Sequence, residues 1–174
     1  MDRVFLDANV LFSAAYRAGS GLVALWRLGT PQLLTSAYAL SEAERNLTRE
    51  DQRRRLAALV RSCEIVPTPS LARLPPQVIL PDNDQPILLA AIAAEATHLL
   101  TGDKTHFGRY YGQRLAGVLV LPPAQYVQQH RPKYALFGHV HQPLVNRGGI
   151  GYTEMVNVGH FQATGRGFTI EAPD

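Results

Sequence analysis

The chain has 174 residues, of which 46% are hydrophobic and 18% charged, and this composition excludes a disordered chain. Its formal net charge of +3 permits a nucleic-acid partner without establishing one. The single cysteine, Cys63, excludes an intramolecular disulfide and a thiolate metal site. The chain shows no signal peptide, and no apolar run is long enough to cross a bilayer. We therefore expect a cytoplasmic protein with no membrane partner.

Strands and helices are predicted to alternate through residues 1–129. The apolar run Val4–Leu6, broken by Asp7, indicates a buried parallel strand that ends at an acid. The later elements, in chain order, are a helix over 20–29, a strand over 31–36, helices over 36–47 and 48–63, a strand at 64–66, a proline-rich loop over 67–81, a helix over 82–96, a strand over 98–103, and a last strand and short helix over 117–130. This alternation is typical of an α/β fold with a parallel sheet covered by helices on both faces.

The helix predicted over 48–63 has two notable features. Thr48 with Asp51 three residues later resembles a capping box, which predicts that the helix begins there. The three arginines at 53–55 point in different directions around a helix, so we interpret them as a solvated face.

Residues 130–174 lack helical periodicity. Short apolar runs at 134–140, 152–159 and 167–171 are separated by the glycine-rich segments 146–151 and 163–167, which we interpret as turns. The sequence thus predicts two parts: an α/β domain over 1–129 and a short β-rich C-terminal extension over 130–174.

Four aspartates lie at predicted strand ends or helix starts: Asp7, Asp82, Asp84 and Asp103. In an open parallel sheet, ligands bind at the carboxyl ends of the strands, so acids delivered there converge in one crevice. Neighbouring carboxylates repel one another unless a cation neutralises them, and oxygen ligands favour Mg²⁺ or Mn²⁺. Each acid taken alone could instead be a helix cap or a solvated turn residue, Asp82 above all.

The segments "VFLDANVLFSA", "LLTSAYALSEAERNL" and "DNDQPILLAAIAAEATHLLTGD", with the final "VLVLPPAQYV", together resemble the PIN-domain nucleases found in toxin–antitoxin systems and among related ribonucleases. The resemblance covers residues 1–129. It implies a catalytic, metal-binding set of four acids and three polar residues that support them: Asp7, Glu42, Asp84 and Asp103, with Asn9, Thr101 and Asp82.

Glu44 is the main alternative to Glu42 within this set. The step of six residues from Ser36 favours Glu42. Residues 42 and 44 of a helix point in well-separated directions, so only one of them is expected to face the crevice.

The resemblance implies a metal-dependent endoribonuclease that uses Mg²⁺ or Mn²⁺, with the toxin of a toxin–antitoxin pair as one such role. Its expected partners are an RNA substrate, an antitoxin protein and a second copy of the chain in a homodimer. Substrate phosphates would be held by Lys104 and Arg17. His106 is near the predicted site, and we interpret it as a surface or capping residue.

The extension carries a second resemblance. The segments "KYALFGHVHQP" and "NRGGIGYTEMVNVGH" are similar to the C-terminal part of calcineurin-like metallophosphoesterases, which implies that His139 and His141 could form a secondary metal site, with His160 as a third ligand. The upstream motifs of that family are absent, so we interpret the extension as a fragment without its own catalysis.

Two alternatives to the nuclease hypothesis stay open at this point. One is a catalytically weak PIN-like module that binds RNA or protein and docks through its extension. The other is a phosphoesterase that a partner chain completes.

Overall fold

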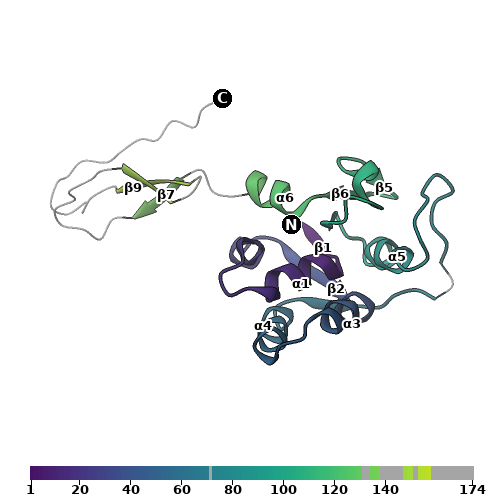
Figure 1. The fold of residues 1–174 in the computed structure, drawn as a ribbon. Helices are drawn as coiled ribbons and strands as arrows, with labels where there is room; N and C mark the ends of the chain where they lie inside the picture. The colour runs from purple at the N-terminus through teal and green to yellow at the C-terminus, as the bar shows by residue number, and fades with distance from the viewer. Residues whose placement is uncertain (71, 131–133, 138–146, 151–152, 158–174) are drawn as a thin grey trace. The chain divides into compact units, whose positions relative to one another are not determined.

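The computed structural model describes residues 1–70, 72–130, 134–137, 147–150 and 153–157, and in the last three ranges only the backbone. The chain divides into two compact units, Met1–Gln129 and His130–Asp174. Figure 1 shows the helices and strands of each unit. Within the described ranges, no helix combines the length and the hydropathy that a membrane span requires.

A six-stranded sheet in the order β3-β2-β1-β4-β6-β5 forms the centre of the first unit. Every pairing is parallel except that of β5 with β6, so the predicted α/β fold is confirmed with one antiparallel edge strand added. The strands are β1 (Arg3–Leu6), β2 (Gln32–Ser36), β3 (Glu64–Val66), β4 (His98–Leu100), β5 (Arg114–Leu115) and β6 (Val118–Leu121).

The antiparallel edge results from a two-residue turn. Ala116 and Gly117 join β5 to β6, and both have positive φ angles, +46° and +93°. Two consecutive residues with positive φ form the turn whose twist matches that of an antiparallel hairpin. The sequence prediction missed β5 because this turn combines glycine with an alanine, which seldom adopts positive φ.

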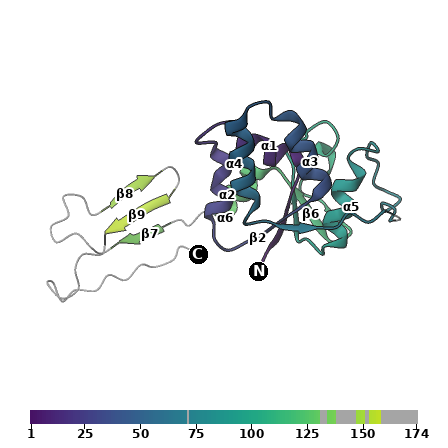
Figure 2. The same ribbon diagram turned by 90° about the horizontal axis from the view of Figure 1, so that it is seen from below.

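Helices cover both faces of the sheet. They are α1 (Ala8–Tyr16), α2 (Ala24–Arg27), α3 (Ala37–Asn46), α4 (Glu50–Val60), α5 (Gln85–Ala93) and α6 (Pro123–His130), with 3₁₀ turns η1 (Gly21–Val23) and η2 (Gly108–Tyr110). Phe5 packs in a core with Ile87 of α5, whereas Leu6 packs in a second core with Leu11 of α1 and Leu56 of α4. Neighbouring residues of β1 thus serve opposite faces. Figures 1 and 2 place α5 and α1 on opposite sides of the sheet.

Two of the predicted helices differ in the structure, and one helix was not predicted. Helix α1 begins directly after β1, at residues for which the sequence analysis predicted the end of a strand and no helix. The helix predicted over 20–29 is a 3₁₀ turn followed by the single turn α2. Helix α4 begins at Glu50 rather than Thr48, because the Arg49 backbone N–H donates to the Gln52 side chain, 3.1 Å away, and this contact fixes the first turn.

Arg55 corrects the interpretation of residues 53–55 as a solvated face. Arg53 and Arg54 are exposed, but Arg55 is half-buried and donates to the carbonyl oxygens of Ala15 and Tyr16, at 2.8 and 3.2 Å. These carbonyls end helix α1 and lack partners within their own helix. Arg55 therefore fixes the end of α1 against α4.

The second unit contains a three-stranded sheet in the order β7-β9-β8, from β7 (Tyr134–Phe137), β8 (Arg147–Ile150) and β9 (Thr153–Asn157). Strand β7 is parallel to β9, and β8 is antiparallel to it. Strand β8 occupies residues that we interpreted as a turn. Main-chain pairing with β9 needs no side chain, so Gly148 and Gly149 are accommodated in it. The strand predicted at 167–171 and the histidines His139, His141 and His160 lie outside the described residues.

Candidate active site

Strands β2 and β3 are added on one side of β1, and the later strands are added on the other side. The candidate site lies at this reversal of the strand order. Strand β1 pairs with β2 on one side and with β4 on the other, and crevices form at the carboxyl ends of strands at such a switch point. Asp7 follows β1 directly, and Thr101 follows β4. The Asp7 backbone N–H donates to the Leu100 carbonyl oxygen, 3.1 Å away, which holds the two strand ends together.

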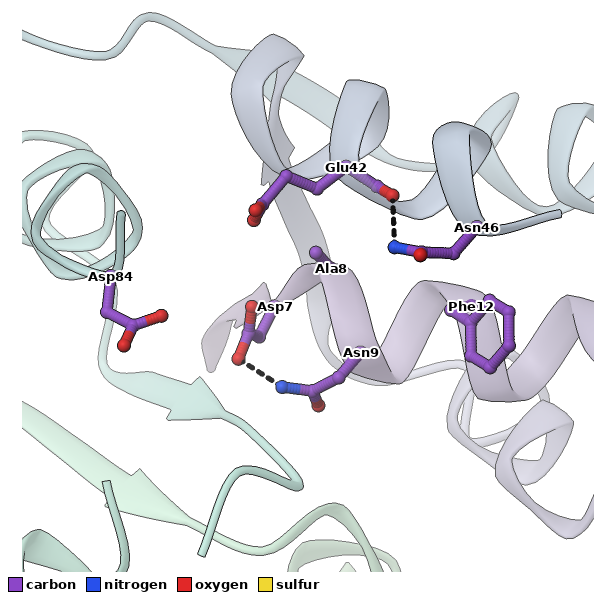
Figure 3. Close-up of a pocket in the computed structure, with 7 residues that line it drawn as sticks. All are labelled: Asp7, Ala8, Asn9, Phe12, Glu42, Asn46 and Asp84. Atoms are coloured by element: carbon purple, nitrogen blue, oxygen red, sulfur yellow. Dashed lines mark hydrogen bonds between the residues drawn. The ribbon is translucent and has the colours of Figure 1, made fainter. Parts of the chain in front are cut away.

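Asp7 is buried, with 5% of its surface exposed, and polar neighbours surround it. The Thr101 hydroxyl donates to Asp7 Oδ2 at 2.6 Å, and the Asn9 side-chain amide donates to the same oxygen. Asn9 in turn accepts a hydrogen bond from the Gly102 N–H at 2.7 Å. Two of the three residues expected to support the acids, Asn9 and Thr101, thus contact Asp7 and fix its carboxyl group. Figure 3 shows the Asn9–Asp7 contact.

Replacing Thr101 with valine is expected to destabilise the protein by about 1–3 kcal/mol, because valine matches the shape of threonine but leaves buried polar partners unpaired. Besides donating to Asp7, the Thr101 hydroxyl accepts hydrogen bonds from the Asn9 amide and the Asp103 N–H, both at 3.1 Å. Thermal unfolding at pH 7.5 measures the loss.

Thr35→Val is the matched control for this prediction, because the buried Thr35 hydroxyl donates only to the Leu6 carbonyl oxygen, 3.0 Å away. The loss in Thr101→Val should be larger at pH 7.5, where Asp7 is ionised, than at pH 4. Equal losses in the two variants at both pH values would contradict the assigned role of Thr101.

A cleft of about 400 Å³ opens beside Asp7, and its lining residues are Asp7, Ala8, Asn9, Phe12, Glu42, Asn46 and Asp84. In Figure 3 the carboxyl groups of Asp7, Glu42 and Asp84 point toward one another across it. Glu42 comes from α3, whose start is fixed by the Ser36 hydroxyl accepting from the Ala39 N–H. Glu44 is exposed and does not line this cleft.

Asp84 supplies a buried oxygen that has no hydrogen-bond donor among the described residues. It is the N-cap residue of α5, but its side chain makes no capping hydrogen bond, so it is free to point into the cleft. Its Oδ2 atom is buried and accepts no hydrogen bond within the described ranges. His106 Nδ1 lies 2.8 Å from this oxygen, close enough for an ion pair when the imidazole is protonated. An unpaired buried carboxylate oxygen is unfavourable unless a cation neutralises it.

Asp103 and His106 bring the loop after β4 to Asp84. Asp103 Oδ1 accepts from the N–H groups of Thr105 and His106, at 2.8 and 3.1 Å, and its Oδ2 lies 2.8 Å from His106 Nδ1. Oxygen and nitrogen atoms of Asp84, Asp103 and His106 could hold one ion. The interpretation of His106 as a surface or capping residue was therefore incomplete; its position three residues after Asp103 in a turn is the sequence feature that could have placed it here.

Burial and mutual repulsion govern the pKa values of the acids. Burial raises the pKa of Asp7 from its ordinary value of 3.8 to about 6, although the hydrogen bonds from Thr101 and Asn9 oppose the rise. Burial, with the charge of Asp84, also raises the pKa of Glu42. Asp103 differs: burial acts to raise its pKa, but hydrogen bonds from His106 and Thr105 outweigh burial and lower it. Burial likewise raises the pKa of Asp84, although the neighbouring His106 opposes the rise. Asp7, Glu42 and Asp84 therefore carry charge that this protein environment disfavours.

The other predicted residues lie outside this cluster. Asp82 is exposed and accepts a hydrogen bond from the Gln85 side chain, at 3.1 Å, as a helix-start residue would. Lys104 and Arg17 are exposed, and neither lines the cleft beside Asp7. Asn46 was missed. It lines the cleft four residues after Glu42 and donates to the Glu42 carbonyl oxygen, at 2.9 Å, and this helical spacing could have indicated it.

The fold and the cleft define an α/β domain with converging carboxylates at a switch point of its sheet. Residues 3–105 match the family described as the PIN domain, and because the match covers more than half of the chain, the chain belongs to this family. No curated protein matches the chain.

Among solved structures, the chain is similar to a chain in the crystal structure of VapBC2 from Rickettsia felis, which is bound to a DNA fragment from the VapBC2 promoter. The TM-score is 0.51 with 17% sequence identity, over 68% of this chain and 97% of the other. At this identity the likeness concerns the fold.

Proposed function

We propose that the protein is a metal-dependent ribonuclease that hydrolyses phosphodiester bonds of RNA. The observation that carries this proposal is the buried Oδ2 of Asp84, which accepts no hydrogen bond from the described residues and lies beside other carboxylates at the switch point of a PIN-family sheet. Oxygen donors of this kind suit Mg²⁺ or Mn²⁺. The residues present therefore fit a divalent ion, which Asp7, Glu42, Asp84 and Asp103 would hold.

Such an ion, when bound, supplies positive charge that stabilises the developing charge on the phosphate and makes a water molecule more acidic. The chain supplies the positioning. Thr101 and Asn9 hold the Asp7 carboxyl group in one orientation. Burial raises the pKa values of Asp7, Glu42 and Asp84, so the charge of a nearby cation would stabilise the ionised form of each of these carboxyl groups. No protein nucleophile is required.

The substrate and partner assignments extend this proposal. Arg17 and Lys104 are exposed cations on α1's C-terminal side and in the loop after Asp103, and we assign them to substrate phosphates. The likeness to VapBC2 supports the proposal that the chain is a toxin with an antitoxin partner. A homodimer and a cytoplasmic location remain predictions from the sequence.

Glu42→Gln and Glu44→Gln together test the function, because both residues belong to α3 but only Glu42 lines the cleft. In Mg²⁺ or Mn²⁺, Glu42→Gln is expected to cut structured and unstructured RNA at least about 100-fold more slowly than wild type, a loss of roughly 3 kcal/mol of transition-state stabilisation. Glu44→Gln should cut at the wild-type rate. The nuclease assignment fails if the wild type cuts no faster than Glu42→Gln with either metal.

A further inference from the structure

A second cleft, of about 490 Å³, lies beside the first along helix α1. Phe12 lines both clefts, so the two are neighbours on either side of this side chain. In Figure 3 Phe12 lies along α1 from Asn9 and the acids. Tyr16 and Arg17 line the second cleft at the end of α1.

Phe12 and Tyr16 form an aromatic pair. They are four residues apart on α1, and their ring centroids are 5.2 Å apart, with an angle of 38° between the planes. The Tyr16 side of the pair is open, with 46% of the residue exposed. Within the described ranges the Tyr16 hydroxyl has no hydrogen-bond partner, so its ring contributes an exposed aromatic face without a structural polar contact.

The position of Tyr16 is nevertheless fixed. Its carbonyl oxygen accepts hydrogen bonds from the Gln52 and Arg55 side chains of α4, at 3.3 and 3.2 Å. Beyond it, Gly19 adopts a φ of +79°, and neither Gly19 nor Gly21 has an atom within 4 Å of where a side chain would begin. The loop thus leaves open space at these glycines, next to an aromatic residue whose backbone is held in place.

Charge complementarity indicates what binds there. The exposed guanidinium of Arg17 makes no ion pair with any described residue, and it follows Tyr16 directly. A ligand with a flat apolar face and a negative charge linked to it fits an aromatic ring beside a cation. Proteins bind single-stranded nucleic acids through this combination of aromatic rings and cations.

We propose that this second cleft is a nucleotide subsite, in which Tyr16 stacks on a base of single-stranded RNA and Arg17 contacts an adjacent phosphate. The inference rests on the proposed function, because it assigns the subsite to the RNA substrate. Tyr16 is about 12 Å further along the helix axis than Ala8, so the stacked base belongs to a nucleotide flanking the bond that is cut.

The test measures binding without cleavage. A fluorescent single-stranded oligoadenylate is titrated with the full chain in EDTA, and anisotropy gives the Kd. Tyr16→Ala is expected to weaken binding about 10-fold, and Tyr16→Trp to stay within about 2-fold of wild type, because stacking accepts any aromatic ring. In Tyr16→Trp, the added indole fluorescence should be quenched by the RNA.

An abasic oligomer of the same length is the matched probe. On it, wild type and Tyr16→Ala should bind alike, whereas Arg17→Ala should weaken binding to both probes. An unchanged Kd for Tyr16→Ala on oligoadenylate overturns the proposal. So does a loss of affinity in Tyr16→Ala that is equal on oligoadenylate and on the abasic oligomer. Either result would mean that the cleft binds a partner of another class. Because EDTA prevents metal-dependent cleavage, this outcome is separate from that of the cleavage assay with Glu42→Gln.

Discussion

Replacing Asp7 with asparagine is expected to abolish RNA cleavage and, at the same time, to raise the melting temperature of the metal-free protein at pH 7.5. Cleavage should fall at least about 100-fold, because asparagine lacks the charge that binds the ion. Stability should rise because Asp7 is buried with a pKa of about 6, so its ionisation in the folded state is unfavourable.

The sign follows from the pKa shift. The pKa of Asp7 is about 6 in the folded protein, whereas its ordinary value is 3.8. Protonation of Asp7 therefore stabilises the folded state; this stabilisation is complete below pH 3.8 and is lost as the pH rises through 6. The shift corresponds to roughly 3 kcal/mol at pH 7.5. Asp7→Asn avoids this loss, and the Thr101 and Asn9 donors can still bond to its amide oxygen.

Thermal unfolding in EDTA at pH 4 and pH 7.5 measures the effect. The variant should melt several degrees above wild type at pH 7.5, and the difference should shrink at pH 4, where Asp7 is protonated in the folded wild type. An inactive variant that is less stable than wild type at pH 7.5 would contradict this account, since the loss of activity would then follow from damage to the fold.

The second expected result concerns the metal itself. Mn²⁺ or Mg²⁺ at about 100 times its Kd should stabilise the wild type by about 2.7 kcal/mol, because the ion binds the folded chain and not the unfolded one. For a chain of this size, that is a rise of several degrees in melting temperature. Asp84→Asn should remove most of the rise, because Asp84 Oδ2 is the buried oxygen that has no hydrogen-bond donor.

Asp82→Asn is the matched control for the metal experiment. Asp82 is two residues from Asp84 and has the same side chain, but it is exposed and bonds to Gln85. Its variant should keep the full metal-induced rise. If Asp82→Asn and Asp84→Asn respond to the metal in the same way, the ion is not held by the cleft that contains Asp84.

The sequence was sufficient to predict the fold of the first unit, because its apolar runs and helical periodicities follow one another in the order of an α/β sheet. The step of six residues from Ser36 favoured Glu42 over Glu44, and Glu42 is the one that lines the cleft with Asp7. The metal-binding roles of these acids remain proposals.

Other features depend on contacts between distant segments, which local patterns do not contain. Arg55 appears as one of three consecutive arginines, and only the packing of α4 on α1 gives it two carbonyl partners. Asp82 and Asp84 are alike in the sequence, and the turn before α5 decides which one faces the cleft. His106 joins the acids because its loop folds back over Asp103.

The bonds around Asp7 have a consequence for synthesis of the chain. Asp7 precedes its main side-chain donor, Thr101, by 94 residues in the chain. During translation, the carboxyl group cannot be oriented until β4 has emerged and paired with β1, and closing so long a loop is slow. A nascent or prematurely terminated chain that ends before Thr101 therefore carries Asp7 and Glu42 without the contact that orients the Asp7 carboxyl group.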